Sequence, residues 1–275
     1  MYGFDSVEEA ITGTRQTSQM LASAGFPLRK WGSNLPEVLE QFPEDHLEKA
    51  PILELDHSAP IKALGLLWKP QSDEFLFKIP EFVESSTSTK RSIQSHVFSL
   101  FDPLGLIGLV ICSAKLLIQT LWEGKFDWDE HLPPDIHNKW VELAEQLPLM
   151  KNLTIPRAVV SDNSSLQLHG FADASQRAYG ACVYFRSVSA SGVVTCRLMA
   201  SKSRIPPVEG RRPTLARLEL CAAVLLSNLQ RRILNDLNVS CQCFCGRIQR
   251  SPSTGSDSLH LGMFSLPIVL QISNS

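Results

Sequence analysis

In the stretch LQLHGFADASQRAYGACVYF, residues 166–185, polar and apolar residues alternate with a period of two. Alternation of this kind predicts half-buried β-strands, separated here by a turn of small and polar residues. We expect three consecutive strands at 166–173, 179–186 and 193–201, with short connections between them. An amphipathic helix is expected at 214–234. Three strands followed by a helix are typical of the start of an α+β or α/β domain.

Upstream, between residues 89 and 147, the apolar spacing is helical, and proline and glycine divide it into three segments. We expect helices at 89–100, 109–122 and 135–147. Each has an apolar stripe, so the three helices are expected to share one small core.

The N-terminal part combines one clear helix with extended segments. Ser6 can cap a helix over 7–24, and Gly25 can end it in the left-handed conformation. Residues 26–31 are expected to form a short strand. Apolar runs on both sides of the polar turn 69–74 predict a β-hairpin.

The composition of the 275-residue chain is that of an ordinary globular protein, with 44% hydrophobic and 20% charged residues and a net charge of −2. It excludes a disordered acidic tail, a collagen-like chain and a wholly basic coat protein. Seven cysteines, an odd number, and the lack of a secretory signal pattern favour a cytoplasmic or nuclear location. Pro103–Ala114, the longest uncharged apolar stretch, is much shorter than the roughly 20 residues of a membrane span, so no membrane partner is expected.

Two carboxylates are candidates for chemistry. Asp173 ends the first strand and precedes small residues, so it should project from the end of a sheet. Glu219 lies in the second turn of the 214–234 helix and borders its apolar stripe, where a carboxylate needs a partner. A Mg²⁺ ion shared with Asp173 would supply one, because Mg²⁺ prefers carboxylates, water and substrate phosphates. The residues alone leave another interpretation open: Asp173 caps a loop, and Glu219 pairs with one of Arg204, Arg211, Arg212 and Arg217.

These segments resemble a known family. HGFADASQRAYGACVYF (169–185), MASKSRIPP (199–207) and TLARLELCAAVLLSNL (214–229) are similar to the RNase H domain of BEL/Pao-type LTR retrotransposon Pol polyproteins. DSVEEA, GFPLRKW, ALGLLW and FDPLGLIGLV, near residues 5, 25, 63 and 101, resemble the segment that joins the polymerase palm to RNase H. Together the similar segments cover about residues 5–245 in the order of the family.

The resemblance implies an α+β architecture, in which a reverse-transcriptase palm remnant and a helical thumb or connection precede a truncated RNase H-like α/β domain. The implied boundaries are 1–84 for the palm remnant, 85–160 for the helical region, 161–245 for the RNase H-like domain and 246–275 for an out-of-frame tail. The polymerase aspartates of the family would precede Asp5, so we expect no primer extension. The implied partners are an RNA/DNA hybrid or other nucleic acid and the remainder of the parent Pol polyprotein.

In RNase H chemistry of this kind, two Mg²⁺ ions flank the scissile phosphate of an RNA strand paired to DNA. By motif, Asp173 matches the acid of the first strand and Glu219 the acid of the first helix, which makes both expected catalytic residues and metal ligands. The next acid of the family lies in a fourth-strand Trp-Thr/Ser-Asp-Ser-Thr motif, where this chain has Gly246–Arg250. We therefore expect a degenerate domain with weak or no activity.

The genetic code suggests why the motif is missing. If Cys245–Arg250 is encoded TGT GGA CGG ATT CAA CGG, reading from the last T of the cysteine codon gives TGG ACG GAT TCA ACG. That series encodes Trp-Thr-Asp-Ser-Thr, the family motif. We infer a change of reading frame near Cys245, with 246–275 out of frame.

Positive charge gathers in the same region. The interval Arg197–Arg232 holds eight basic and two acidic residues, a local charge of 8 − 2 = +6, which could follow a phosphate backbone or form a plain solvated face. The candidate nucleic-acid contacts are Lys202, Arg204, Arg211 and Arg212. A non-catalytic nucleic-acid-binding remnant or co-opted module is therefore the alternative to a degenerate nuclease.

Two other functions are disfavoured. The region around FDPLGLIGLV is often labelled a Pao retrotransposon peptidase, but aspartic peptidases need paired aspartates, usually in Asp-Thr-Gly or Asp-Ser-Gly turns. The nearest approach is Asp173–Ser175, and Ser253–Gly255 lacks the aspartate. Cys241, Cys243 and Cys245 alternate, which favours one apolar strand face over a zinc site.

Overall fold

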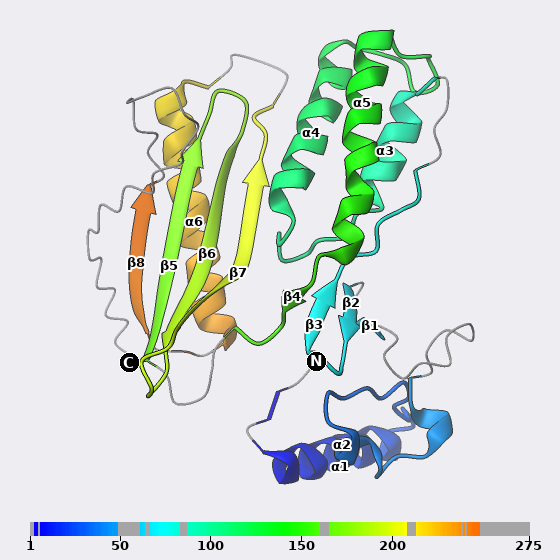
Figure 1. The fold of residues 1–275 in the computed structure, drawn as a ribbon, viewed down its shortest axis with the longest axis vertical. Helices are drawn as coiled ribbons and strands as arrows, with labels where there is room; N and C mark the ends of the chain where they lie inside the picture. The colour runs from blue at the N-terminus through cyan, green and yellow to red at the C-terminus, as the bar shows by residue number, and fades with distance from the viewer. Residues whose placement is uncertain are drawn as a thin grey trace. The chain divides into compact units, whose positions relative to one another are not determined.

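The computed structural model describes residues 3–4, 6–48, 61–63, 66–82, 87–159, 165–207, 213–237, 239 and 241–247 (Figure 1). Contacts divide the chain into two compact units: Met1–Ile79 with Leu147–Arg157, and Pro80–Gln146 with Ala158–Ser275. The boundaries implied by the resemblance stay a prediction, because this division follows contacts and not ancestry.

The first unit begins with the predicted helix, α1 (Val7–Ser23), followed by α2 (Pro36–Leu39) and the 3-10 turn η1 (Glu44–His46). The Ser6 hydroxyl accepts a hydrogen bond from the Glu9 amide at 3.1 Å and so caps α1. Gly25, with φ 83°, follows the helix in the left-handed conformation. Both predicted ends of this helix are confirmed.

The strand predicted at residues 26–31 is wrong. Only Trp31 pairs with another segment, in a single bridge to Leu47. Lys30 has φ 63°, a left-handed conformation that interrupts an extended backbone. The Trp31 ring instead stacks on Phe42, with ring centroids 4.2 Å apart.

The predicted hairpin is confirmed and belongs to a four-stranded antiparallel sheet. Its strands are β1 (Ile61–Ala63), β2 (Leu66–Lys69), β3 (Glu74–Leu76) and β4 (Ile155–Pro156), in that order across the sheet. Asp73 turns the β2–β3 hairpin with φ 52°, and its carboxylate accepts a hydrogen bond from Trp68 Nε1 at 2.9 Å. The pairing of β4 with β3 joins residues some 80 positions apart, which periodicity does not predict.

The second unit contains the three predicted helices, α3 (Lys90–Phe98), α4 (Gly108–Glu123) and α5 (Pro134–Gln146), followed by the 3-10 segment η2 (Leu147–Asn152) of the first unit. Their apolar stripes meet in one core, as expected. Its buried members are Ile93, Val97, Ala114, Leu117, Ile118, Leu121, Leu132, Ile136, Trp140 and Ala144.

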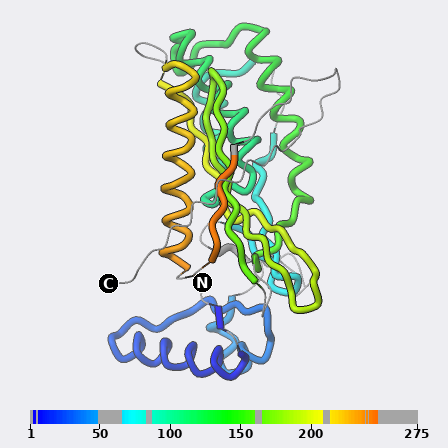
Figure 2. The backbone as a smooth tube through the Cα atoms, turned by 90° about the vertical axis from the view of Figure 1, so that its left-hand side faces the viewer, coloured from blue at the N-terminus to red at the C-terminus, as the bar shows by residue number. Residues whose placement is uncertain are grey.

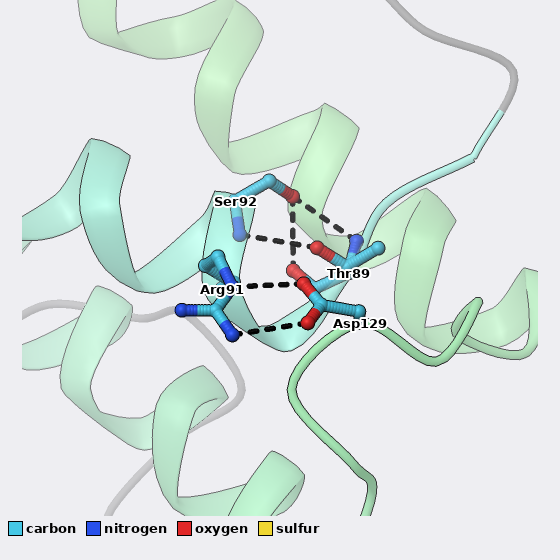
Figure 3. A network of polar contacts seen from close by, with 4 residues as sticks. All are labelled: Thr89, Arg91, Ser92 and Asp129. Atoms are coloured by element: carbon cyan, nitrogen blue, oxygen red, sulfur yellow. Dashed lines mark hydrogen bonds and ion pairs between the residues drawn. The ribbon is translucent and has the colours of Figure 1, made fainter.

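Polar contacts fix the start of α3 (Figure 3). Thr89 and Ser92 form a capping box, in which each side chain accepts a hydrogen bond from the other residue's amide, at 3.2 Å and 3.0 Å. Beside it, Arg91 Nε and Nη2 donate to the two carboxylate oxygens of Asp129 at 2.8 Å and 3.0 Å. The turn before α5 is thereby tied to the first turn of α3.

The second sheet contains the predicted strands, β5 (Ser165–Ala174), β6 (Tyr179–Val188) and β7 (Val194–Arg204), and a fourth strand, β8 (Gln242–Arg247). The order across the sheet is β7-β6-β5-β8, and β8 runs parallel to β5. Parallel neighbours need a crossover, which α6 (Leu215–Leu237) provides by packing along one face (Figures 1 and 2). The α+β class is confirmed.

Gly170 allows α6 to lie close to β5. A Cβ built on Gly170 would lie 2.5 Å from Gln230 Nε2 and 2.6 Å from Leu226 Cδ1. Cys241, Cys243 and Cys245 pack partly buried against the same core, which confirms that they share one apolar face. The buried members of this core are Leu168, Ala181, Val183, Phe185, Ala200, Leu225, Leu226 and Ile233.

Candidate active site

Asp173 lies in the second-last position of β5, and its side chain is exposed. Leu168 and Ala172 face the core under α6, so alternation along the strand turns Asp173 toward the other, open face of the sheet. Across the sheet, Asp173 pairs with Gly180 and Gly180 with Ser203. Asp173, Gly180 and Ser203 therefore form one row of paired residues across β5, β6 and β7, with the predicted acid at its end.

Glu219 is half-buried and lies near the start of α6. It precedes Leu226 by seven residues, two helical turns, so the two share a face and lie about 10 Å apart along the axis. Asp173 lies three residues beyond Gly170, about 10 Å along the strand. Leu226 contacts Gly170, and α6 begins at the end of the sheet where β5 ends (Figure 1). Asp173 and Glu219 consequently lie at the same level along the sheet.

One Mg²⁺ ion held by two carboxylates, water and substrate phosphate oxygens is the arrangement that the assignment requires. The alternation of β5 turns Asp173 to the face of the sheet opposite α6, so the common level along the sheet does not by itself bring the two carboxylates together. They do not fit two fully ligated ions, because a two-metal site needs acids converging from further elements. Among the residues that the structure describes, no group of three or more His, Cys, Asp and Glu side chains could hold a metal ion. The assignment of Asp173 and Glu219 to one metal site stays a prediction.

Basic side chains lie at the same end of the sheet. Lys202 and Arg204 are exposed near the end of β7, on either side of Ser203 in the Asp173 row. Two strand spacings separate β7 from β5, about 10 Å. Arg211 and Arg212 lie outside the described residues.

The sequence did not single out Arg177, which the structure adds to this end of the sheet. It is exposed in the turn between β5 and β6, four residues after Asp173. The Ser175 hydroxyl shapes this turn by accepting hydrogen bonds from the amides of Arg177 and Ala178, at 3.2 Å and 3.1 Å. The signal available in the sequence was a basic residue in the turn that follows the candidate acid.

Strand β8 overlaps the expected position of the family motif, residues 246–250, at Gly246 and Arg247. Its register runs from the Gln167–Gln242 pair to the Ala172–Arg247 pair. Of the inferred out-of-frame tail, only Gly246 and Arg247 are described.

The open face of the sheet carries aromatic and imidazole rings. His169 stacks on Phe244 with ring centroids 4.7 Å apart, and Phe171 meets Tyr184 edge to face at 6.2 Å. Burial, with a smaller contribution from nearby Arg186, lowers the pKa of His169, so its ring is neutral at physiological pH. A neutral, stacked imidazole suits a packing role.

Burial also affects two thiols at the start of β8, those of Cys241, which precedes the strand, and Cys243, which lies in it. Burial raises the pKa of the Cys243 thiol to about 11 and also raises that of Cys241. Thiols with a raised pKa stay protonated at neutral pH and are poor nucleophiles and metal ligands. Their role in this unit is to pack against α6.

Comparisons with known proteins point to one family. A model of the Pao retrotransposon-like RNaseH-like domain matches residues 89–246, more than half of the chain, which confirms the resemblance drawn from the motifs. No curated protein matches the chain. None of the described helices is long and apolar enough to cross a lipid bilayer.

Solved structures of a foamy viral protease-reverse transcriptase are also similar. One, a form designated dRH in complex with double-stranded DNA, is 15% identical with a TM-score of 0.45, and the match covers 91% of this chain and 38% of that chain. Another, also in complex with double-stranded DNA, is 12% identical with a TM-score of 0.37. The match covers 91% of this chain and 45% of that chain. The chain thus spans less than half the length of the proteins it matches.

Proposed function

Because the chain belongs to the Pao retrotransposon-like RNaseH-like domain family, we propose that β5 to β8 and α6 form a degenerate RNase H site. Its ancestral activity is cleavage of the RNA strand of an RNA/DNA hybrid with two Mg²⁺ ions, one to activate water and one to stabilise the leaving oxygen. Asp173 and Glu219 are the remaining ligands. Residual activity is weak or absent, since loss of one acid removes several kcal/mol of charge stabilisation.

The register between β5 and β8 carries this proposal. Ala172 pairs with Arg247, so a parallel strand that continued by one residue would set position 248 beside Asp173. In the alternative reading frame, position 248 is the aspartate of the Trp-Thr-Asp-Ser-Thr motif. The frame change therefore removes an acid at the one place where it would adjoin Asp173.

The range of the family match is consistent with a frame change. The match ends at residue 246, next to Cys245, where the alternative codon series begins. On this proposal 246–275 is an out-of-frame tail, and 161–245 is the truncated nuclease domain. Segments 1–84 and 85–160 would be the palm remnant and the helical connection of the same Pol polyprotein, acting in the cytoplasm or nucleus.

A restored site provides the test. We expect the native chain to cleave a labelled RNA/DNA hybrid in Mg²⁺ barely above background. The variant Gly246→Trp, Arg247→Thr, Ile248→Asp, Gln249→Ser, Arg250→Thr should cleave at least about 100-fold faster, as several kcal/mol of restored charge stabilisation requires. The single Ile248→Asp variant should recover part of this gain.

Matched controls separate the metal site from a change in folding. Adding Asp173→Asn or Glu219→Gln to the restored variant should abolish cleavage, and Ile248→Asn should recover none. Restored folding without cleavage would contradict the nuclease assignment, as would cleavage that survives Asp173→Asn.

A non-catalytic nucleic-acid-binding module is the second candidate, favoured by the exposed Lys202 and Arg204. Basic side chains at this position would contact backbone phosphates. Lys202→Gln should therefore weaken binding of the hybrid and reduce the slope of log affinity against log salt concentration by about one. Binding by the native chain, without cleavage by the restored variant, would support this candidate over the nuclease.

A further inference from the structure

Within the described part of the chain, no strand pairs with the outer edge of β8. β8 is the last strand in the order β7-β6-β5-β8, and it pairs with β5 along its whole length, from Gln242 to Arg247 (Figure 1). A strand with one neighbour directs about half of its N–H and C=O groups away from that neighbour. The outer edge of β8 is therefore a template for a further strand.

The opposite edge of the sheet is partly covered. There the Ser201 amide of β7 donates a hydrogen bond to Leu104 O, in the loop before α4, at 2.8 Å. Nearer the end of β7, Lys115 Nζ of α4 donates to Ser203 O at 3.5 Å. A covered edge hinders the addition of another strand. Pairing with a partner is therefore expected at β8 and not at β7.

β8 also lacks the devices that keep an exposed edge single. Such edges are commonly protected by proline, lysine or a β-bulge. The strand reads QCFCGR, and its six pairs with β5 follow one another without a shift of register. Its one charged residue, Arg247, is the last. A regular and nearly uncharged edge favours pairing with another strand.

The strand is complementary to a second copy of itself. A two-fold axis perpendicular to the sheet sets two β8 strands antiparallel and places residues of the same face opposite each other. With Phe244 on the axis, the two Phe244 rings form a cross-strand aromatic pair, which is favourable. Gln242 then lies opposite Gly246 of the second copy. No like charges are opposed, because the two Arg247 side chains lie at opposite ends of the paired strands.

The position of α6 leaves room for this arrangement. α6 packs chiefly on β5 and β6, so in one continuous sheet the two α6 helices would lie about 20 Å apart. A helix with its side chains is about 10 Å across, so the two helices do not collide. Pairing uses both β8 edges and leaves the two β7 strands at the outer edges of the combined sheet. The assembly therefore closes as a dimer instead of growing.

We propose that two copies of this chain form a dimer by antiparallel pairing of their β8 strands about Phe244. The dimer uses neither Asp173 nor Glu219 and is independent of the nuclease assignment. A six-residue edge covers less than the roughly 1,200 Å² at which stable interfaces begin. We therefore expect a weak dimer, with a dissociation constant in the micromolar range.

Sedimentation velocity of the full chain, under reducing conditions, tests the proposal. Between about 1 and 100 µM the average mass should rise from 30.5 kDa toward twice that value. Phe244→Lys and Phe244→Asp each set like charges opposite one another at the axis and remove the aromatic pair. Each variant alone should therefore dimerise about tenfold more weakly. An equimolar mixture of the two should dimerise again, because opposite charges then meet.

Tyr184→Lys is the matched control. Tyr184 and Phe244 both pair with His169 and lie on the same face of the sheet, but Tyr184 belongs to β6, two strands from the edge. This variant should dimerise as the native chain does. Gln242→Lys, at an exposed position, adds an edge lysine without removing a ring contact, so it should weaken the dimer even if the Phe244 variants fail to fold.

Two results would overturn the proposal. One is a full chain that stays monomeric up to about 100 µM, as it would if another segment of the same chain covered β8. The other is loss of dimerisation in Tyr184→Lys but not in Gln242→Lys, which would locate the interface away from the edge. For folded Phe244 variants, a mixture no more associated than either variant alone would also exclude the register about Phe244.

Discussion

The Ser201 hydroxyl of β7 donates a hydrogen bond to the carbonyl of Gly105, in the loop that leads into α4. The Ser201 amide also donates to Leu104 O at 2.8 Å. Asp102 shapes this loop by accepting hydrogen bonds from the amides of Leu106 and Ile107, at 2.8 Å and 2.9 Å. Because β7 is an edge strand, the loop pairs with backbone groups that the edge would otherwise expose.

Gly105→Ala should destabilise the protein strongly. Gly105 has φ 73°, and a Cβ on it would collide with the Ser201 backbone carbonyl, which cannot move aside as a flexible side chain can. We expect a loss of at least about 2 kcal/mol in the free energy of unfolding, measured with urea. Gly192→Ala is the matched control, since Gly192 has φ 83° but open space around it, and it should lose only about 1 kcal/mol. Equal losses would show that the close approach has no energetic role.

Lys90→Met should destabilise the helical core of the second unit. Lys90 is only 4% exposed; its ammonium lies 3.4 Å from the Trp122 ring centroid and donates to Phe126 O at 3.2 Å. Removing the charge forfeits the cation–π contact and leaves a carbonyl without its donor, together about 1–3 kcal/mol. Thermal unfolding followed by tryptophan fluorescence measures the loss. The same change at exposed Lys139 should be nearly neutral, and a similar shift there would point to a general effect of the substitution.

The Arg91–Asp129 pair should be visible in a titration. Hydrogen bonds from the Arg91 guanidinium lower the pKa of the Asp129 carboxyl below its ordinary value. In Arg91→Gln the pKa of Asp129 should rise to the ordinary range, as followed by NMR of the side-chain carboxyl. Because both side chains are largely exposed, the effect on stability should be small. An unchanged pKa in the variant would mean that the pair does not persist in solution.

Acid should destabilise the helical core through His96. Burial lowers the pKa of this ring, and within the described residues its Nε2 has no hydrogen-bond partner. The unfolded chain takes up the proton near the ordinary histidine pKa of about 6.5, whereas the folded chain does so only at lower pH. The free energy of unfolding should therefore fall as pH drops below about 6.5. His96→Gln should flatten this dependence and exposed His131→Gln should not; identical slopes in the two variants would refute the role of His96.

Local sequence patterns were sufficient for most helices and strands. The period of two at 166–201 and the helical spacing at 89–147 correspond to β5 to β7 and to α3 to α5. These patterns predict the elements because a helix or strand that buries one face needs apolar residues at its own repeat, 3.6 or 2 residues. The strand predicted at 26–31 failed because the left-handed Lys30 and the Trp31–Phe42 stack override local preference.

Motifs identified the candidate acids but not their surroundings. Asp173 and Glu219 follow from residue type and spacing, whereas their common level along the sheet depends on the contact between Leu226 and Gly170. Arg177 was not found, because it belongs to no contiguous motif.

Consecutive residues were enough to establish the α+β class and the family, since periodicity and motifs are both local properties of the chain. Only the tertiary structure decided that β8 runs parallel to β5, with Arg247 beside Ala172, and that Ser201 closes on Gly105. Such pairings depend on backbone hydrogen bonds and close packing between distant segments. Side-chain periodicity specifies which face of an element is buried, but it does not specify which partner covers that face.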